Sequence, residues 1–367
     1  MKNTLTFAAI IAAALYFLSV GHLAMIGALL LMILVHEFGH WVVARSLGYE
    51  VQTFSIGFGS SPRLRLGKLW GTEFQITPWL AGGFVSINPA DDSFRLSAAW
   101  KRISVLVAGV VMNVISAAVI LFMVFATMGQ QDRVEKPNTV HIAGLATDVT
   151  VAADAGLEAG DRVVSVDGTA VANVKEFIAA VNNGKGRAIA IEVERSGARQ
   201  TVSVTPNDKG RIGVALQTQY EVIYHKMSVL EAAGKATTGT VDGCTAIVKG
   251  LGMMVGLVAP PENLPDGAMD VRGIVAIVQM GDMAWENGIY SWLMLVVMVS
   301  FNLAVFNLLP IPMLDGGHIA FIVIEKIIGR PVPEKIQVVV SYMALAGLLS
   351  LFVLGLFNDI FKPLKLK

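Results

Sequence analysis

Long apolar segments alternate with polar stretches along this chain, and their lengths predict its main elements. Apolar runs lie at 4–20, 23–45, 103–128, 291–309 and 338–357. An α-helix rises 1.5 Å per residue, so about 20 apolar residues cross the hydrocarbon layer of a bilayer. The pattern predicts a polytopic α-helical membrane protein with four spans, or five if 4–20 is a separate helix that a turn at Gly21-His22 divides from the next.

A different pattern, typical of strands, follows the second apolar run. Residues 64–66 and 73–76 alternate between apolar and polar, with a turn expected at 68–71, and 79–85 is apolar and glycine-rich. Next to a membrane helix, these segments predict a membrane-associated β-hairpin or sheet. Backbone at that depth must be buried by protein or line a cavity. An open sheet edge there could bind an extended substrate as one more strand. An ordinary cytoplasmic hairpin is the alternative.

Charged residues return between 130 and 222, and the apolar runs shorten. Residues 156–168 contain a turn, an alternating strand and an Asp-Gly turn, and a helix capped by Asn173 follows. Strands are expected at 188–194, 200–204 and 211–216. These elements predict an inserted α/β domain with a core of its own.

The remaining boundaries follow from the same patterns. Residues 223–288 predict an interfacial segment: an amphipathic stretch at 228–257, as one helix or a pair lying at the membrane interface, and a linker with Pro260, Pro261 and Pro265. The expected organisation is an N-terminal apolar segment (1–22), a first membrane half (23–129), the α/β domain (130–222), the interfacial segment (223–288) and a second membrane half (289–367).

Composition agrees with a membrane protein. The 367 residues are 54% hydrophobic and 15% charged, against about 25% charged in soluble domains. The net charge of zero argues against nucleic acid as a partner, and the single cysteine excludes an internal disulfide or a cysteine-based zinc site.

Basic residues gather between the first two long spans, which indicates that this side is cytoplasmic and the α/β domain extracytoplasmic. They are Arg45, Arg63, Arg65, Lys68, Lys101 and Arg102.

The strongest chemical pattern is His36-Glu37-Phe38-Gly39-His40, inside an apolar run. Histidines four residues apart share one face of a helix, so both rings can reach one metal ion. Glu37 beside them can take a proton from a metal-activated water. Histidines packing near a helix end are the alternative, but ionisable side chains in a span are costly and usually functional.

A second acidic position lies in the broken apolar segment 307–318. Pro310 and Pro312 interrupt a helix there, and Asp315-Gly316-Gly317 follows. Catalytic zinc takes three protein ligands plus water, and two histidines with one carboxylate form a common set. Asp315 is therefore the expected third ligand, ahead of His318. A capping Asp at a helix end is the alternative.

These motifs, together with Gly156 to Gly168, resemble those of the site-2 protease family of intramembrane zinc metalloproteases, in the bacterial type that regulates sigma factors. The stretch Gly156 to Gly168 resembles the core of a PDZ domain in its permuted bacterial arrangement. The resemblance covers nearly the whole chain in the family's order. It implies Zn²⁺ on His36, His40 and Asp315, Glu37 as catalytic base, and Asn307 holding the substrate carbonyl or the oxyanion.

The resemblance also implies regulated intramembrane proteolysis of single-span membrane proteins, for example anti-sigma factors or signal-peptide remnants, after a prior extracytoplasmic cut. The expected location is the inner membrane, with the active site near the cytoplasmic side and an extracytoplasmic PDZ domain acting as size filter or sequence reader. Substrate contacts are expected from a dispersed set of residues. They are Asn113, Phe54, Gly57, Gly59, Gly82, Gly83 and Pro310.

Two other classes of function use the same features. A zinc transporter could use the same ligands, although transport does not require Glu37. A membrane-anchored PDZ scaffold could carry an inactive metal site. Replacing Glu37 by Gln separates the three, because only a protease loses cleavage while it retains zinc.

Overall fold

The computed structural model describes residues 18–59, 63–88, 93–146, 149–254, 256–259 and 273–361. Two compact units are present, and each is described by itself. Unit 1 combines the chain before Met128 with the chain after Met227, and unit 2 is Gly129–Lys226. The unit 2 bounds extend the predicted 130–222 by one residue at the start and four at the end. The predicted segment 4–20 falls mostly outside the described residues, as do the proline linker and the C-terminal lysines.

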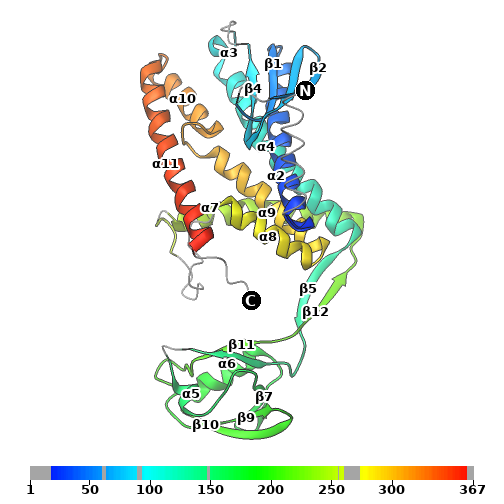
Figure 1. Ribbon diagram of the computed structural model, residues 1–367, viewed down its shortest axis with the longest axis vertical. Helices are drawn as coiled ribbons and strands as arrows, with labels where there is room; N and C mark the ends of the chain where they lie inside the picture. Colours follow the sequence, from blue (N-terminus) through cyan, green and yellow to red (C-terminus); the bar gives the residue numbers. More distant parts are fainter. Residues whose placement is uncertain are drawn as a thin grey trace. The chain divides into compact units, whose positions relative to one another are not determined.

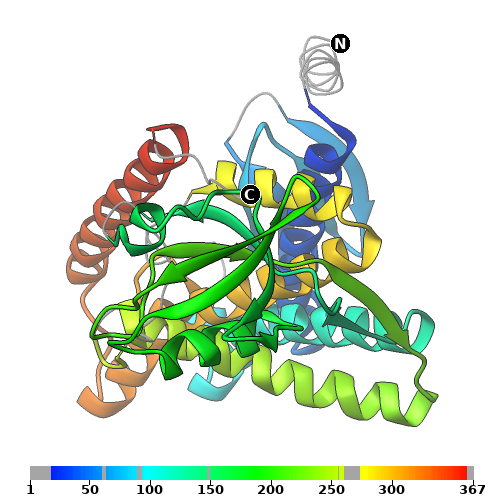
Figure 2. The same cartoon turned by 90° about the horizontal axis from the view of Figure 1, so that it is seen from below.

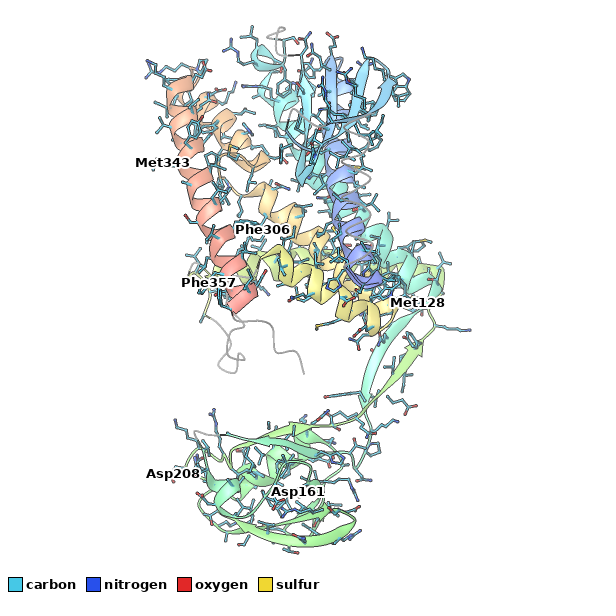
Figure 3. The ribbon with its side chains drawn as sticks, in the orientation of Figure 1. Met128, Asp161, Asp208, Phe306, Met343 and Phe357 are labelled. Carbon is cyan, nitrogen blue, oxygen red and sulfur yellow. The ribbon has the colours of Figure 1, made fainter. Side chains whose placement is uncertain are left out.

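Four described helices are long and apolar enough to cross a membrane: α2 (Val20–Ser46), α4 (Ala99–Thr127), α9 (Ile289–Leu308) and α11 (Glu334–Phe361). Each matches one of the predicted spans to within a residue at its C-terminal end or contains it. In Figure 1, α11 lies on the side of unit 1 away from α2, and Figure 2 shows the same separation. Most of α11 is exposed, including Met343 and Phe357, which are labelled in Figure 3.

Helix α2 begins earlier than the sequence suggests. Ser19 caps it, because its hydroxyl accepts the backbone N–H of His22 at 3.1 Å. Gly21 therefore lies inside the first turn, and the predicted break at Gly21-His22 is wrong. Gly21 instead allows close approach to Asp282 of α8 (Ile274–Glu286), whose carboxylate lies 3.4 Å from His22 Nδ1.

Four strands form the predicted sheet beside α2: β1 (Val51–Phe58), β2 (Leu64–Leu69), β3 (Thr72–Ile76) and β4 (Trp79–Ile87). The β2–β3 hairpin is confirmed, and its turn is at Trp70-Gly71, both with positive φ. The strand order is β2-β3-β1-β4, so β1 pairs in parallel with β3 and antiparallel with β4. Among the described strands, β4 is therefore an edge strand with one partner.

The sheet packs on the second half of α2 through an aromatic core. Trp41 of α2 lies against Phe74 and stacks on Trp70, and its indole N–H donates to Thr72 Oγ1 at 3.0 Å. Val51 and Phe54 are buried in the same cluster. This packing positions the sheet beside the helix segment that carries His36, Glu37 and His40.

The rest of unit 1 is helical. A short helix α3 (Ser93–Leu96) precedes α4, and α7 (Val229–Met254) is one 26-residue helix, which decides between the single helix and the pair. Ala232 and Ala236 of α7 pack against α4 and α9. Helix α8 has no side-chain cap of its own, and Asp359 of α11 accepts its first N–H groups, from Gly273 and Ala276. Helix α10 (Asp315–Ile328) follows α9.

Unit 2 is an α/β domain, as predicted. Its sheet has the order β10-β9-β7-β6-β11, with β8 paired to β7, and its apolar core includes Val163, Phe177 and Ile191. The bounds are β6 (His141–Leu145), α5 (Val151–Asp154), β7 (Arg162–Val166), β8 (Thr169–Ala170), α6 (Val174–Asn183), β9 (Ile189–Arg195), β10 (Ala198–Val204) and β11 (Val214–Gln217).

The predicted elements of unit 2 are found close to their expected ranges, with one shifted strand, but β6, α5 and β8 were not predicted. Asn173 caps α6 by accepting the Glu176 N–H at 2.9 Å, as predicted. The last sheet strand begins at Val214 and not at Arg211, because Gly213 has a φ of +81° that a strand does not use. A two-stranded ribbon, β5 (Gln130–Glu135) with β12 (Tyr220–His225), was not expected and joins the two ends of the unit.

Candidate metal centre

The predicted His36-Glu37-x-x-His40 pattern lies in the second half of α2, within one unbroken helix. His36, Glu37 and His40 are each 7–8% exposed. The spacing of four residues brings the two imidazoles together edge to face, with ring centroids 4.7 Å apart. Burial of three ionisable side chains on one helical turn indicates a site that a ligand completes, because isolated buried charge is costly.

Asp315 reaches this turn from the other end of the chain. Helix α9 ends at Leu308, the prolines at 310 and 312 follow, and Met313 adopts a φ of +84°. Gly316 and Gly317 have no room for a side chain, because backbone atoms of the preceding loop pack directly on them. The loop therefore folds tightly on the start of α10, and Asp315 is the first residue of that helix.

Three ligand atoms form a nearly equilateral triangle. The Nε2 atoms of His36 and His40 are 3.1 Å apart, and Asp315 Oδ2 lies 3.1 Å and 3.4 Å from them. A tetrahedral zinc ion with ligand bonds of about 2.0–2.2 Å separates its ligand atoms by about 3.3 Å. Asp315 Oδ2 is buried and has no hydrogen-bond donor. A shared cation satisfies these converging lone pairs, so the residues fit a zinc ion.

A second layer of contacts holds the two imidazoles. His40 Nδ1 lies 2.7 Å from the backbone oxygen of Val105 in α4, so Nδ1–H donates and Nε2 remains free to bind a metal. His36 Nδ1 lies 3.3 Å from Nδ2 of Asn113, also in α4. Asn113 is fully buried beside this imidazole.

Two glycines leave room for the site. A Cβ on Gly109 of α4 would lie 2.5–2.7 Å from ring atoms of His36 and His40. A Cβ on Gly83 of β4 would lie 2.7 Å from Glu37 Cγ and 2.8 Å from the Ser55 backbone oxygen. The edge strand therefore runs directly against Glu37.

The other predicted residues are more dispersed. Asn307 is half-buried in the last turn of α9, and the described residues give it no hydrogen bond to the metal triangle. Phe54 is 1% exposed in the sheet core, so the expected substrate contact of its side chain is wrong, because it has no free surface. His318 is exposed and lies outside the cluster, in agreement with the choice of Asp315.

The glycine and proline positions lie around the sheet and loop. Gly57 and Gly59, at the end of β1, both have positive φ. Gly82 precedes Gly83 on the edge strand, and a Cβ there would meet the Phe58 ring. Pro310 is exposed in the loop between α9 and α10.

Sequence reasoning missed several contributors to the site. The Val105 carbonyl leaves no trace in the sequence, because any residue supplies one. Gly109 could have been suspected, since glycine four residues before Asn113 would put both on one face of a helix. A partly buried ion pair, Arg102 of α4 with Glu325 of α10 at 3.0 Å, holds the helix that carries Asp315.

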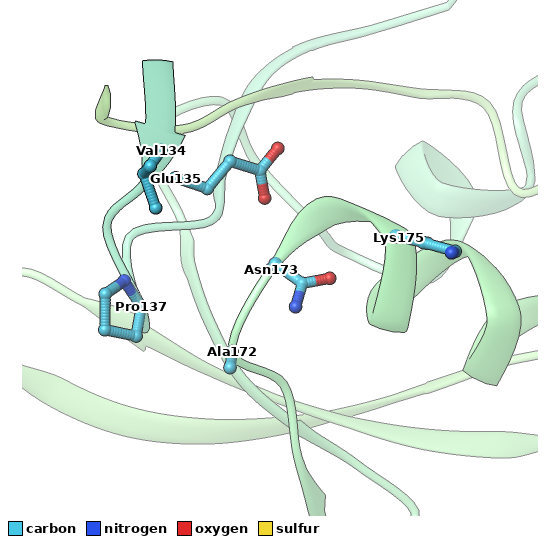
Figure 4. Close-up of a pocket in the computed structure, with 6 residues that line it drawn as sticks. All are labelled: Val134, Glu135, Pro137, Ala172, Asn173 and Lys175. Carbon is cyan, nitrogen blue, oxygen red and sulfur yellow. The ribbon is translucent and has the colours of Figure 1, made fainter. Parts of the chain in front are cut away.

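Unit 2 contains a separate groove of about 450 Å³, shown in Figure 4. Two of its polar lining residues, Asn173 and Glu135, already have structural partners. Asn173 caps α6, and Glu135 accepts the backbone N–H of Val174 at 3.2 Å. The groove is therefore explained by the start of a helix, and the cluster in unit 1 is the candidate functional site.

Comparison with known proteins gives one consistent family. Residues 24–351 match peptidase family M50. The chain is 34% identical over 357 residues to a Nostoc sp. protein named "Putative zinc metalloprotease all3971", covering 91% of this chain and 93% of that one. It is 29% identical over 383 residues to "Putative zinc metalloprotease Cj1068" of Campylobacter jejuni, covering 98% of each. It is 27% identical over 442 residues to "Regulator of sigma-E protease RseP" of Escherichia coli, covering 90% and 96%.

Proposed function

The chain belongs to peptidase family M50, and from that premise we propose how its residues cleave a peptide bond. It is an intramembrane zinc metalloprotease and a multi-pass membrane protein. We assign the zinc ligands to His36, His40 and Asp315, and the catalytic base to Glu37. The triangle of acceptor atoms 3.1–3.4 Å apart carries this assignment.

Proton transfer belongs to Glu37. A zinc ion in the triangle supplies a Lewis acid that makes water nucleophilic at neutral pH. Glu37 accepts the proton of the attacking water and passes it to the nitrogen of the departing amine. Its burial between α2 and Gly83 keeps the carboxylate in one place and away from bulk water. The amide N–H of Asn307 donates to the substrate carbonyl as negative charge develops there.

The edge strand β4 presents the substrate. A helical substrate hides its carbonyls in i→i−4 hydrogen bonds, so it must unwind before attack. β4 has one described partner and runs past Glu37 at Gly83, which supports pairing of an extended substrate along its open edge. Gly82 keeps that stretch free of side chains, and Gly57, Gly59 and Pro310 border the same region.

Unit 2 is a PDZ domain in this proposal, and it controls access. The basic residues gathered between the first two spans support a cytoplasmic location for that side, and unit 2, which follows α4, is then extracytoplasmic. The metal centre then lies near the cytoplasmic side of the inner membrane.

The proposed substrates are single-span membrane proteins already cut outside the membrane. Similarity to proteins named regulator of sigma-E protease supports anti-sigma factors as one such class.

The test compares the parent protein with Glu37→Gln. Each is co-expressed with single-span proteins whose outer domains have been shortened, and substrate length and bound zinc are both measured. We expect Glu37→Gln to retain zinc and to lose cleavage by at least about 100-fold, because it cannot take a proton. Glu334→Gln, an exposed change on α11, is the matched control. Cleavage by Glu37→Gln, or zinc flux in a parent that cleaves nothing, would contradict the proposal.

A further inference from the structure

We propose that Asn113 is a positioning residue: its carboxamide oxygen accepts the Nδ1–H of His36 and thereby aims the His36 Nε2 lone pair at the metal. This inference rests on the proposed zinc ligands. In this inference Asn113 acts through His36. The sequence instead predicts that Asn113 contacts the substrate.

Asn113 lies where three helices meet. It is fully buried on α4, and its side chain faces His36 of α2. Its backbone oxygen accepts the hydroxyl of Ser300 on α9 at 3.0 Å and that of Ser116 at 2.9 Å. Ser300 is itself fully buried. The Asn113 backbone is therefore held from two sides, so its amide has a defined position beside the imidazole.

The chemistry of the imidazole requires an acceptor at this position. A neutral histidine that binds a metal through Nε2 carries its proton on Nδ1, and that N–H needs an acceptor when it is buried. His40 shows the arrangement, with Nδ1 placed 2.7 Å from the Val105 oxygen. For His36, the described contact at Nδ1 is the Asn113 amide.

The amide atoms of Asn113 indicate how its carboxamide is oriented when a metal is bound. Nδ2 faces His36 Nδ1 at 3.3 Å, and Asn113 Oδ1 is buried without a hydrogen-bond partner. With a metal on Nε2, this orientation would place an N–H against an N–H. A half-turn of the carboxamide exchanges O and N with almost no change in shape. This rotation places Asn113 Oδ1 next to the Nδ1–H of His36, so that the unpaired acceptor accepts from the unpaired donor.

The NH₂ group that turns away also has an expected acceptor. Asn287 and Asn302 each donate Nδ2 to the backbone oxygen four residues earlier, at 2.8 Å and 3.1 Å. If the Asn113 amide follows the same relation in α4, the acceptor for its NH₂ group is the backbone oxygen of Gly109. The half-turn therefore pairs the carboxamide oxygen and offers its nitrogen an acceptor as well.

The experiment measures zinc affinity, with cleavage as a second readout. Asn113→Leu keeps the approximate size and removes the acceptor, and Asn113→Asp keeps an acceptor and removes the donors. Asn302→Leu and Asn302→Asp are matched controls on α9, where the amide serves only its own helix. Each full-length protein is purified in detergent, checked for monodispersity, and titrated with a chromophoric zinc chelator at neutral pH.

We expect Asn113→Leu to bind zinc 10–100-fold more weakly than the parent, and Asn113→Asp to stay within threefold or to bind more tightly. The Asn302 variants should match the parent. If Asn113→Leu does not yield folded protein, Asn113→Ala replaces it as the variant without an acceptor, and Asn113→Asp still separates an acceptor from a donor role.

Two results would overturn the inference. Parental zinc affinity in Asn113→Leu would show that no acceptor is needed, and equal weakening in Asn113→Asp would show a donor or a packing role. In both cases the parent still binds zinc and cleaves, so the proposed function stands. A parent that binds no zinc would overturn the proposed function, and this inference with it.

Discussion

Single residues decide whether three ligands can meet one ion. The histidines and the aspartate supply the lone pairs, but two glycines supply the space around them. Gly109 faces both imidazoles from α4, and Gly83 faces Glu37 from β4. At each position a methyl group would fall well inside van der Waals contact of a catalytic side chain. Buried ligands cannot move aside without leaving their own hydrogen bonds, so these glycines are part of the site.

Gly109→Ala should therefore abolish stable zinc binding. The added methyl would lie 2.5–2.7 Å from ring atoms of both histidines, and displaced rings cannot keep a tetrahedral ligand set. The zinc-to-protein ratio of purified protein, measured by atomic absorption, should fall from about one to below about 0.1.

Gly27→Ala is the control for that change, because it lies on α2 with open space around its Cβ position. It should keep the parental ratio. A Gly109→Ala protein that holds a full equivalent of zinc would show that the rings can shift without losing the metal.

Elements from opposite halves of the chain bring these residues together. Helices α2 and α4 hold the histidines and their hydrogen-bond partners, and the start of α10 holds the carboxylate. The Arg102–Glu325 ion pair ties α4 to α10, with both side chains less than a fifth exposed.

In unit 2 a similar tie holds the loop before β7, because the Arg195 guanidinium contacts Asp161 twice at 2.7 Å and Glu158 at 2.6 Å.

The Asp161–Arg195 tie should make unit 2 sensitive to acid. The hydrogen bonds from Arg195 hold the pKa of the buried Asp161 carboxyl below its usual range. A carboxyl with a lowered folded-state pKa stabilises the fold above its unfolded pKa of about 3.9, and that contribution is lost as pH falls through the folded value. Amide hydrogen-exchange protection of β7 and β9 should therefore drop below about pH 4.

Asp161→Asn provides the comparison. It should lower protection of β7 and β9 at pH 7 by about 2–3 kcal/mol, because it removes the buried carboxylate and leaves the guanidinium paired only with the exposed Glu158. Its protection should also change less between pH 7 and pH 4 than that of the parent. Equal pH profiles for the two proteins would show that Asp161 does not supply the acid sensitivity.

At the scale of the whole molecule, chemistry and the inserted domain are separate. Every candidate metal ligand and the proposed base lie in unit 1, and unit 2 is inserted between Met128 and Met227. The β5–β12 ribbon pairs Gln130 with His225, so the insertion leaves and returns at neighbouring points. A short bridge can therefore replace unit 2 without stretching α4 or α7.

Replacing residues 129–226 with a short Gly/Ser linker should leave zinc binding within about threefold of the parent, because no ligand is removed. If unit 2 controls access, single-span proteins that keep their outer domains should become substrates. Substrate shortening on co-expression measures this, with Glu37→Gln in the same deletion as the control. Unchanged rejection of uncut proteins would show that selection takes place in unit 1.

The sequence alone determined the features that depend on neighbouring residues. The four spans, the His36–His40 spacing, the α6 cap at Asn173 and the β2–β3 hairpin follow from short-range periodicity, capping and turn chemistry. Even Asp315 could be singled out, because prolines, glycines and an acid in one apolar segment have few structural uses.

Tertiary structure alone decided which distant groups share a site. Nothing local indicates that β1 enters between β3 and β4, which buries Phe54 and leaves β4 at the edge beside Glu37. Nor can a sequence show that the Val105 oxygen and the Asn113 amide reach the two imidazoles. These contacts depend on how the helices and the sheet pack, and packing joins residues without regard to their separation along the chain.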